Sequence, residues 1–89
     1  MTEPAPFAAF EAVIARAAPD APCHVALPPD AVSRGWREAF VALCALEGGA
    51  PFRRTVAPAP DGRWLVTLGA AHLARAGLAE GDRARVALT

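Results

Sequence analysis

The chain has 89 residues, 54% of them hydrophobic, and a formal net charge of zero, with nine arginines and no lysine against nine acidic residues. This length makes one domain, and a composition this apolar excludes an intrinsically disordered chain. A neutral chain has no strong electrostatic attraction for nucleic acid or for an anionic membrane, although charge segregated on one face would restore it.

The sequence also favours a cytoplasmic protein. Its first ten residues lack a basic region before an apolar core, so we expect no signal peptide. No stretch approaches the roughly 18 apolar residues that span a membrane. The two cysteines, Cys23 and Cys44, are too few for the disulfide framework of a small secreted domain.

The N-terminal part of the chain predicts an arm and one ambiguous element. Residues 1–6 are polar and proline-containing, which predicts a flexible arm. The segment Phe7–Arg16 is rich in Ala, Glu and Arg, which favour a helix, but Phe10, Ala12 and Ile14 alternate as in a strand. Local sequence leaves both interpretations open.

A turn, a strand and a short helix are expected next. Residues 17–22, AAPDAP, contain two prolines and predict a turn. Cys23–Leu27 alternates as a strand until the tandem prolines that follow it. Asp30 is suited to cap a short helix that continues to Arg34.

The following segment has two interpretations. Four large apolar residues recur at helical spacing: Val32, Trp36, Phe40 and Leu43. They favour one long helix over residues 30–47, closed by the glycine pair after it. Against this, Gly35 would interrupt the helix, and Ala39–Leu46 is also typical of a strand buried on both faces.

The C-terminal part is better marked. Pro51–Ala57 and Arg63–Leu68 predict two strands joined by an Asp-Gly turn, which makes 51–68 an antiparallel hairpin. Ala70–Ala76 predicts a short helix that Gly77 ends in a left-handed conformation. A turn at residues 80–82 then leads into a last strand, in which Ala84, Val86 and Leu88 share one face. Residues 24–35 echo residues 64–77, which suggests two similar halves.

Five motifs in this order carry a resemblance to a known family. They are F-x-A-x-I (Phe10–Ile14), V-A-L-P (Val25–Pro28), G-x-P-F-R (Gly49–Arg53), P-x-x-D-G-R-W (Pro58–Trp64) and G-L-x-x-G-D (Gly77–Asp82). The chain resembles a small uncharacterised bacterial family with AbrB-like hairpins. Members are often associated with YdeI/OmpD-associated bacteriocin-protection domains.

The resemblance implies a mainly β fold. It covers Phe10 to Leu88 and implies a small double-split (AbrB-like) β-barrel of about six strands with two short helices, and we expect residues 7–89 to form this single domain. It also implies that Phe10–Arg16 and Ala39–Leu46 are strands. The family has no established activity, so the resemblance supplies a fold and no mechanism.

We expect no metal site and no catalytic site. Cys23, His24, Cys44 and His72 lack the spacing of zinc ligands, which favours buried cysteines and exposed histidines. A nucleophilic Cys23 is the remaining route to an enzyme. Ser33, the one serine, lies outside any nucleophile elbow, and no glycine loop has the form that binds phosphate. No cofactor is expected.

Arginines beside an aromatic residue form the candidate ligand or partner surface. Its members are Arg53, Arg63, Trp64, Arg83 and Arg85. Such side chains suit an anion, a nucleic acid or a protein, although a solvated barrel face is the more common explanation. The leading hypothesis is a non-enzymatic cytoplasmic binding or adaptor module, monomeric or homodimeric, for an unknown small ligand or protein partner. The alternative is an AbrB-like nucleic-acid-binding regulator, which the neutral charge disfavours.

Overall fold

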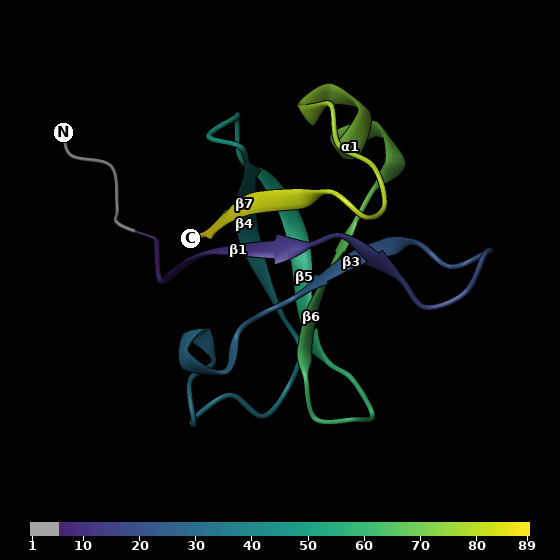
Figure 1. The fold of residues 1–89 in the computed structure, drawn as a ribbon. Helices are drawn as coiled ribbons and strands as arrows, with labels where there is room; N and C mark the ends of the chain where they lie inside the picture. The colour runs from purple at the N-terminus through teal and green to yellow at the C-terminus, as the bar shows by residue number, and fades with distance from the viewer. Residues whose placement is uncertain (1–5) are drawn as a thin grey trace, which may run out of the picture.

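A computed structural model describes residues 6–89, so the predicted flexible arm, residues 1–6, lies outside the described residues except for Pro6. The protein is mainly β, an antiparallel and nearly closed barrel with one α-helix and one 3₁₀ turn (Figure 1). The elements in chain order are β1 (Ala8–Val13), β2 (Ala15–Arg16), β3 (Cys23–Ala26), the 3₁₀ turn η1 (Pro29–Ala31), β4 (Phe40–Leu46), β5 (Phe52–Pro58), β6 (Trp64–Leu68), α1 (Ala70–Ala76) and β7 (Arg83–Leu88).

The two end strands of the sheet are joined by a single residue, which brings the sheet round into a nearly closed barrel. The sheet order is β1-β7-β4-β5-β6-β3-β2, and the two end strands are consecutive in sequence, separated by Ile14 alone. Ile14 is 1% exposed, and its backbone donates to the Asp82 carbonyl and accepts from Gly81. The predicted strand over Phe10–Arg16 is therefore confirmed, with a break at Ile14. That break turns the expected six strands into seven.

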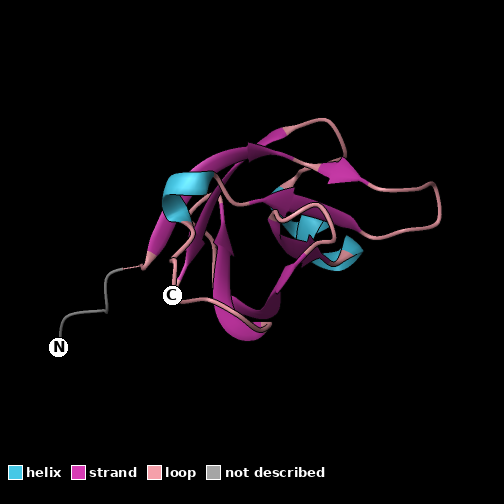
Figure 2. Cartoon of the chain, turned by 90° about the horizontal axis from the view of Figure 1, so that it is seen from below, coloured by secondary structure: helices cyan, strands magenta, loops and turns pink. Residues whose placement is uncertain are grey.

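The alternation expected of the strands places one face of each in a common core. Val25, Val56 and Val66 stand opposite one another across β3, β6 and β5, and all three are fully buried. Cys44 and Leu88 pair in the same way across β4 and β7, and both are fully buried as well. Figure 2 shows the strands curving around this interior, with the helical turns outside it.

The prediction of a second short helix is wrong, and so is the alternative of a long helix over residues 30–47. The helical conformation lasts only for the three-residue turn η1, which begins at the tandem prolines, since Val32 directly after it is extended, with φ −93° and ψ 125°. The chain then continues without regular structure to β4, which confirms the strand expected at Ala39–Leu46.

The helical spacing of Trp36 and Phe40 has a different cause. Their rings pack at a centroid distance of 4.8 Å, and Trp36 also contacts Phe7 and Trp64 at 5.8 and 5.4 Å. This aromatic cluster anchors the irregular segment between η1 and β4 against the barrel. The helical spacing of Trp36 and Phe40 therefore arises from ring packing in a loop and not from a helix.

The C-terminal unit folds as its sequence predicts. Gly77 ends α1 at φ 71°, and its N–H donates to the Ala74 and Leu73 carbonyls. Leu78 donates to the Leu73 carbonyl, which completes a Schellman-type end. The hairpin of β5 and β6 also forms, and the strands of the internal echo, β3 and β6, pair antiparallel. Within residues 6–89, no helix is long and apolar enough to cross a membrane.

Candidate ligand groove

The barrel is open along a seam between β1 and β3. β2 pairs with β3 at Ala15↔His24, and continuing that register would place Val13 opposite Ala26 and Glu11 opposite Pro28. Neither pair forms, since within residues 6–89 β1 has β7 as its one ladder neighbour. Figure 1 shows β1 and the chain after β3 diverging toward the left of the view.

A hollow of about 600 Å³ lies over this seam. We name it the seam groove, and its lining residues are Glu11, Ala26, Leu27, Pro28, Pro29, Val32, Ser33, Arg34, Gly62, Arg63 and Trp64. These residues come from β1, from the end of β3 with the turn behind it, and from the start of β6. Its size and its mixture of apolar walls with a few polar groups are typical of a ligand site.

Three charged side chains converge on the seam groove from different elements. Glu11 lies 3.9 Å from Arg83, and Arg63 donates to Asp61 at 2.7 Å. Arg34 makes no ion pair or hydrogen bond with any described residue. A ligand can therefore form an ion pair with the Arg34 guanidinium without breaking an existing ion pair or hydrogen bond.

The Asp61–Arg63 contact shapes one rim of the groove. Asp61 accepts from the Arg63 backbone at 3.0 Å as well as from its guanidinium. These hydrogen bonds lower the pKa of the Asp61 carboxyl below its usual value. Gly62 between them has φ 89°, which suits the predicted Asp-Gly turn.

The five residues of the predicted arginine–tryptophan surface do not form one surface. Arg63 and Trp64 line the seam groove, but the Trp64 ring is 9% exposed and packs in the aromatic cluster. Arg83 pairs with Glu11 at the groove's edge, and Arg85 pairs with Glu47 at 3.4 Å.

Arg53 is isolated from the other four. It lies on β5 beside a separate shallow hollow of Val41, Arg54, Thr55 and Thr67. It faces Leu43 of β4 in the ladder, and Leu43 is 40% exposed. The five residues of the candidate surface therefore lie at separate places around the barrel.

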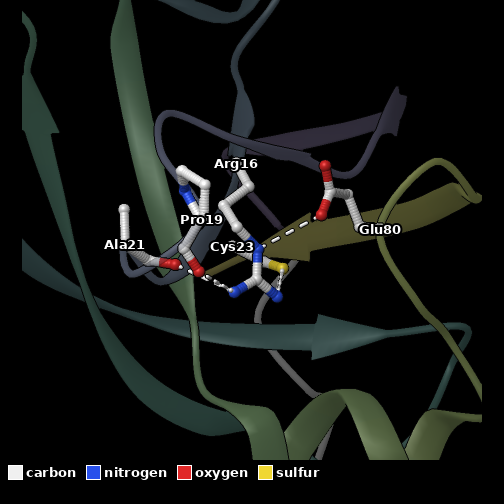
Figure 3. A network of polar contacts seen from close by, with 5 residues as sticks. All are labelled: Arg16, Pro19, Ala21, Cys23 and Glu80. Atoms are coloured by element: carbon white, nitrogen blue, oxygen red, sulfur yellow. Dashed lines mark hydrogen bonds and ion pairs between the residues drawn. The ribbon is translucent and has the colours of Figure 1, made fainter.

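Cys23 belongs to a polar network around Arg16, at the point where β2 pairs with β3 (Figure 3). Arg16 donates to the Cys23 sulfur at 3.3 Å, to Glu80 at 3.2 Å, and to the Pro19 and Ala21 carbonyls. Cys23 itself is 4% exposed. This network ties the turn after β2 to the turn before β7.

The histidines differ from the prediction that they are exposed. His24 is 8% exposed, because β2 and β6 flank it with Ala15 and Thr67. His72 stacks flat on Phe52 at a centroid distance of 3.7 Å, and its buried Nδ1 has no hydrogen-bond partner among the described residues. Within residues 6–89, no group of three His, Cys, Asp or Glu is placed to hold a metal ion.

The sequence does not single out Glu11 or Arg34 as groove residues, because Glu11 is an unspecified position of the F-x-A-x-I motif and Arg34 belongs to none of the five motifs. Glu11 was expected on a strand face and Arg34 at the end of a helix that does not form. The tandem prolines are the local signal of the open seam, because two successive residues without an N–H cannot continue a strand ladder.

Comparison with known proteins places the chain in a family. The family model described as Domain of unknown function (DUF1905) matches residues 10–88, from β1 to the end of β7. No curated protein and no solved structure matches the chain. Because the match covers nearly the whole chain, the protein belongs to the DUF1905 family, a domain of unknown function.

Proposed function

We propose that this domain is a non-enzymatic binding module that holds its ligand in the seam groove. The observation that carries the proposal is the coincidence of the open seam with an apolar hollow of about 600 Å³. Side chains fill the interior of this barrel, so the apolar hollow where a ladder is missing is the natural place for a ligand.

The lining indicates the ligand's chemistry. Leu27, Val32 and the adjacent prolines favour a partly apolar group, and the unpaired Arg34 favours a negatively charged or hydrogen-bond-accepting group. Both features suit a small organic acid or a segment of a protein.

The charge distribution argues against the alternative of a nucleic-acid binder. Arg63, Arg83 and Arg85 each lie beside a carboxylate, so their charges are locally neutralised. A nucleic-acid site needs several free cations along one track.

A binding role without catalysis agrees with the state of the reactive groups. The Cys23 sulfur is buried and hydrogen-bonded to Arg16, and it lies outside the groove lining. Burial raises the pKa of the Cys44 thiol to about 11, with a smaller opposing effect of Arg54, so its nucleophilic thiolate is scarce at neutral pH.

The resemblance supplies the setting of the proposal. We propose a cytoplasmic bacterial adaptor with the double-split, AbrB-like barrel, acting beside a bacteriocin-protection-type protein. The antiparallel pairing of β3 with β6, the two strands of the internal echo, supports that barrel type.

Filling the groove tests the proposal. The purified chain is screened by thermal shift and NMR against a panel of organic acids and peptides. We expect hits whose binding is lost in Ala26→Trp, which fills the groove, and kept in Ala74→Trp, which adds the same side chain to the exposed face of α1. Hits that bind both variants equally, or a panel without hits, would contradict the proposed function.

A further inference from the structure

The free edge of β1 has backbone groups that point into the seam. Ile14 donates to the Asp82 carbonyl at the position that continues the β1–β7 register, so the Ile14 N–H points toward β7. Hydrogen-bonded and non-hydrogen-bonded pairs alternate in an antiparallel ladder. The N–H and C=O groups of Glu11 and Val13 therefore point away from β7.

The opposite side of the seam cannot satisfy those groups. Beyond His24, β3 has no partner on this side, and the register would bring Glu11 to Pro28, which has no N–H. The Pro28 carbonyl already accepts from Ala31 within η1. The proline pair thus holds the seam open and leaves the β1 edge without a strand.

The groove wall beside this edge suits an extended chain. Pro28 and Val32, both half-buried, offer apolar contacts along the seam, and Arg34, which pairs with no described residue, lines the same groove. Val13 on the edge strand is 49% exposed, an apolar side chain that an added strand would cover. Free strand edges recruit peptides by main-chain hydrogen bonding, and alternate side chains then fill the adjacent pockets.

We propose that the seam groove takes an extended peptide segment of a partner protein, which adds to β1 as a further strand. Its backbone pairs with the groups of Glu11 and Val13. Alternate apolar side chains contact Pro28 and Val32, and an acidic side chain pairs with Arg34. The inference rests on the proposed function, since it names the ligand class of the same groove.

Peptide display on the full-length chain supplies the probe. A random linear library is selected against the immobilised protein, and the tightest peptide is synthesised with single N-methylated amides. Methylation at positions facing β1 is expected to weaken binding about tenfold, since each removes one main-chain hydrogen bond, and methylation at the intervening positions is expected to have little effect.

Variants of the chain test the same geometry from the protein side. Val13→Pro removes an N–H that faces the seam and leaves the β7 ladder intact, so it is expected to lose the peptide about tenfold. Val13→Thr keeps the N–H and is the matched control. Thermal unfolding of both shows whether they fold, and the N-methylated peptides test the geometry without any change to the protein.

The outcomes separate the inference from the proposed function. One outcome is a peptide whose binding is lost in the Ala26→Trp variant but is unchanged by N-methylation at every position. That outcome would overturn strand addition and leave the groove as a ligand site. A library that yields no peptide, together with small acids that bind, would overturn the peptide class alone. Failure of both kinds of ligand would remove the proposed function as well.

Discussion

The Arg54 guanidinium holds Thr67 through two hydrogen bonds, from Nε to the backbone carbonyl at 2.6 Å and from Nη2 to Oγ1 at 2.7 Å. The β5–β6 ladder covers only the pairs from Val56↔Val66 to Pro58↔Trp64, so beyond Val66 the carbonyl of β6 needs another donor. Arg54 supplies it from the neighbouring strand and bridges the point where β5 and β6 separate.

Arg54→Met is therefore expected to lower the free energy of unfolding by about 2 kcal/mol, the value of hydrogen bonds with a charged, half-buried donor. Arg53→Met is the control, because the exposed Arg53 makes no hydrogen bond or ion pair with a described residue, and a change within about 0.5 kcal/mol is expected. Urea unfolding measures both. Equal losses would show that the bridge does not stabilise the barrel.

The thiol of Cys44 predicts a loss of stability in alkali. Burial raises its pKa from 9.0 to about 11 in the folded chain, so between these values the unfolded chain loses a proton that the folded chain keeps. Stability is complete below about pH 9 and falls by about 2 kcal/mol toward pH 11. Urea unfolding across this range measures the decline. A Cys44→Ala chain should decline less steeply, and identical slopes would contradict the assignment.

The left-handed glycine at the end of α1 predicts a backbone cost. A Cβ at Gly77 would meet no atom within 4 Å, so Gly77→Ala adds no clash and measures the strain of φ 71° alone, about 1 kcal/mol. Gly35→Ala is the matched control, because its Cβ would only touch the Ser33 hydroxyl at 3.8 Å and its φ is not positive. Thermal unfolding should separate the two variants, and a stable Gly77→Ala would refute the role of the turn.

The aromatic cluster predicts that an irregular segment carries much of the stability. Trp36 contacts Phe7, Phe40 and Trp64, so Trp36→Ala is expected to cost about 2–3 kcal/mol. Arg37→Ala changes the exposed neighbour and is expected to be neutral. Chemical denaturation distinguishes them. A neutral Trp36→Ala would mean that the loop is not anchored.

Local sequence predicts the elements with clear punctuation and fails where packing decides. The strands after Pro51, the helix ended by Gly77 and the last strand follow from alternation and turn residues alone. The segment Phe10–Arg16 needed the family resemblance, because its helix propensity conflicts with its alternation. The spacing of Trp36 and Phe40 suggests a helix only because aromatic packing happens to repeat at that interval.

The candidate groove was beyond local prediction for a geometric reason. Its residues come from three places far apart in the sequence, and the seam exists because two strands do not pair. Patterns predict which face of a strand is buried, as they do for Ala84, Val86 and Leu88, but not which strand edge is left free. The candidate surface groups arginines because they lie on strand faces, and the barrel places those faces apart.

Amide hydrogen exchange along β1 tests the central claim, the open seam and its added strand, most directly. In the free chain, we expect the amides of Glu11 and Val13 to exchange faster than those of Phe10 and Ala12, whose N–H groups face β7. With the selected peptide bound, Glu11 and Val13 should become protected and the other two should not change. Uniform protection in the free chain, or no gain on binding, would contradict the account.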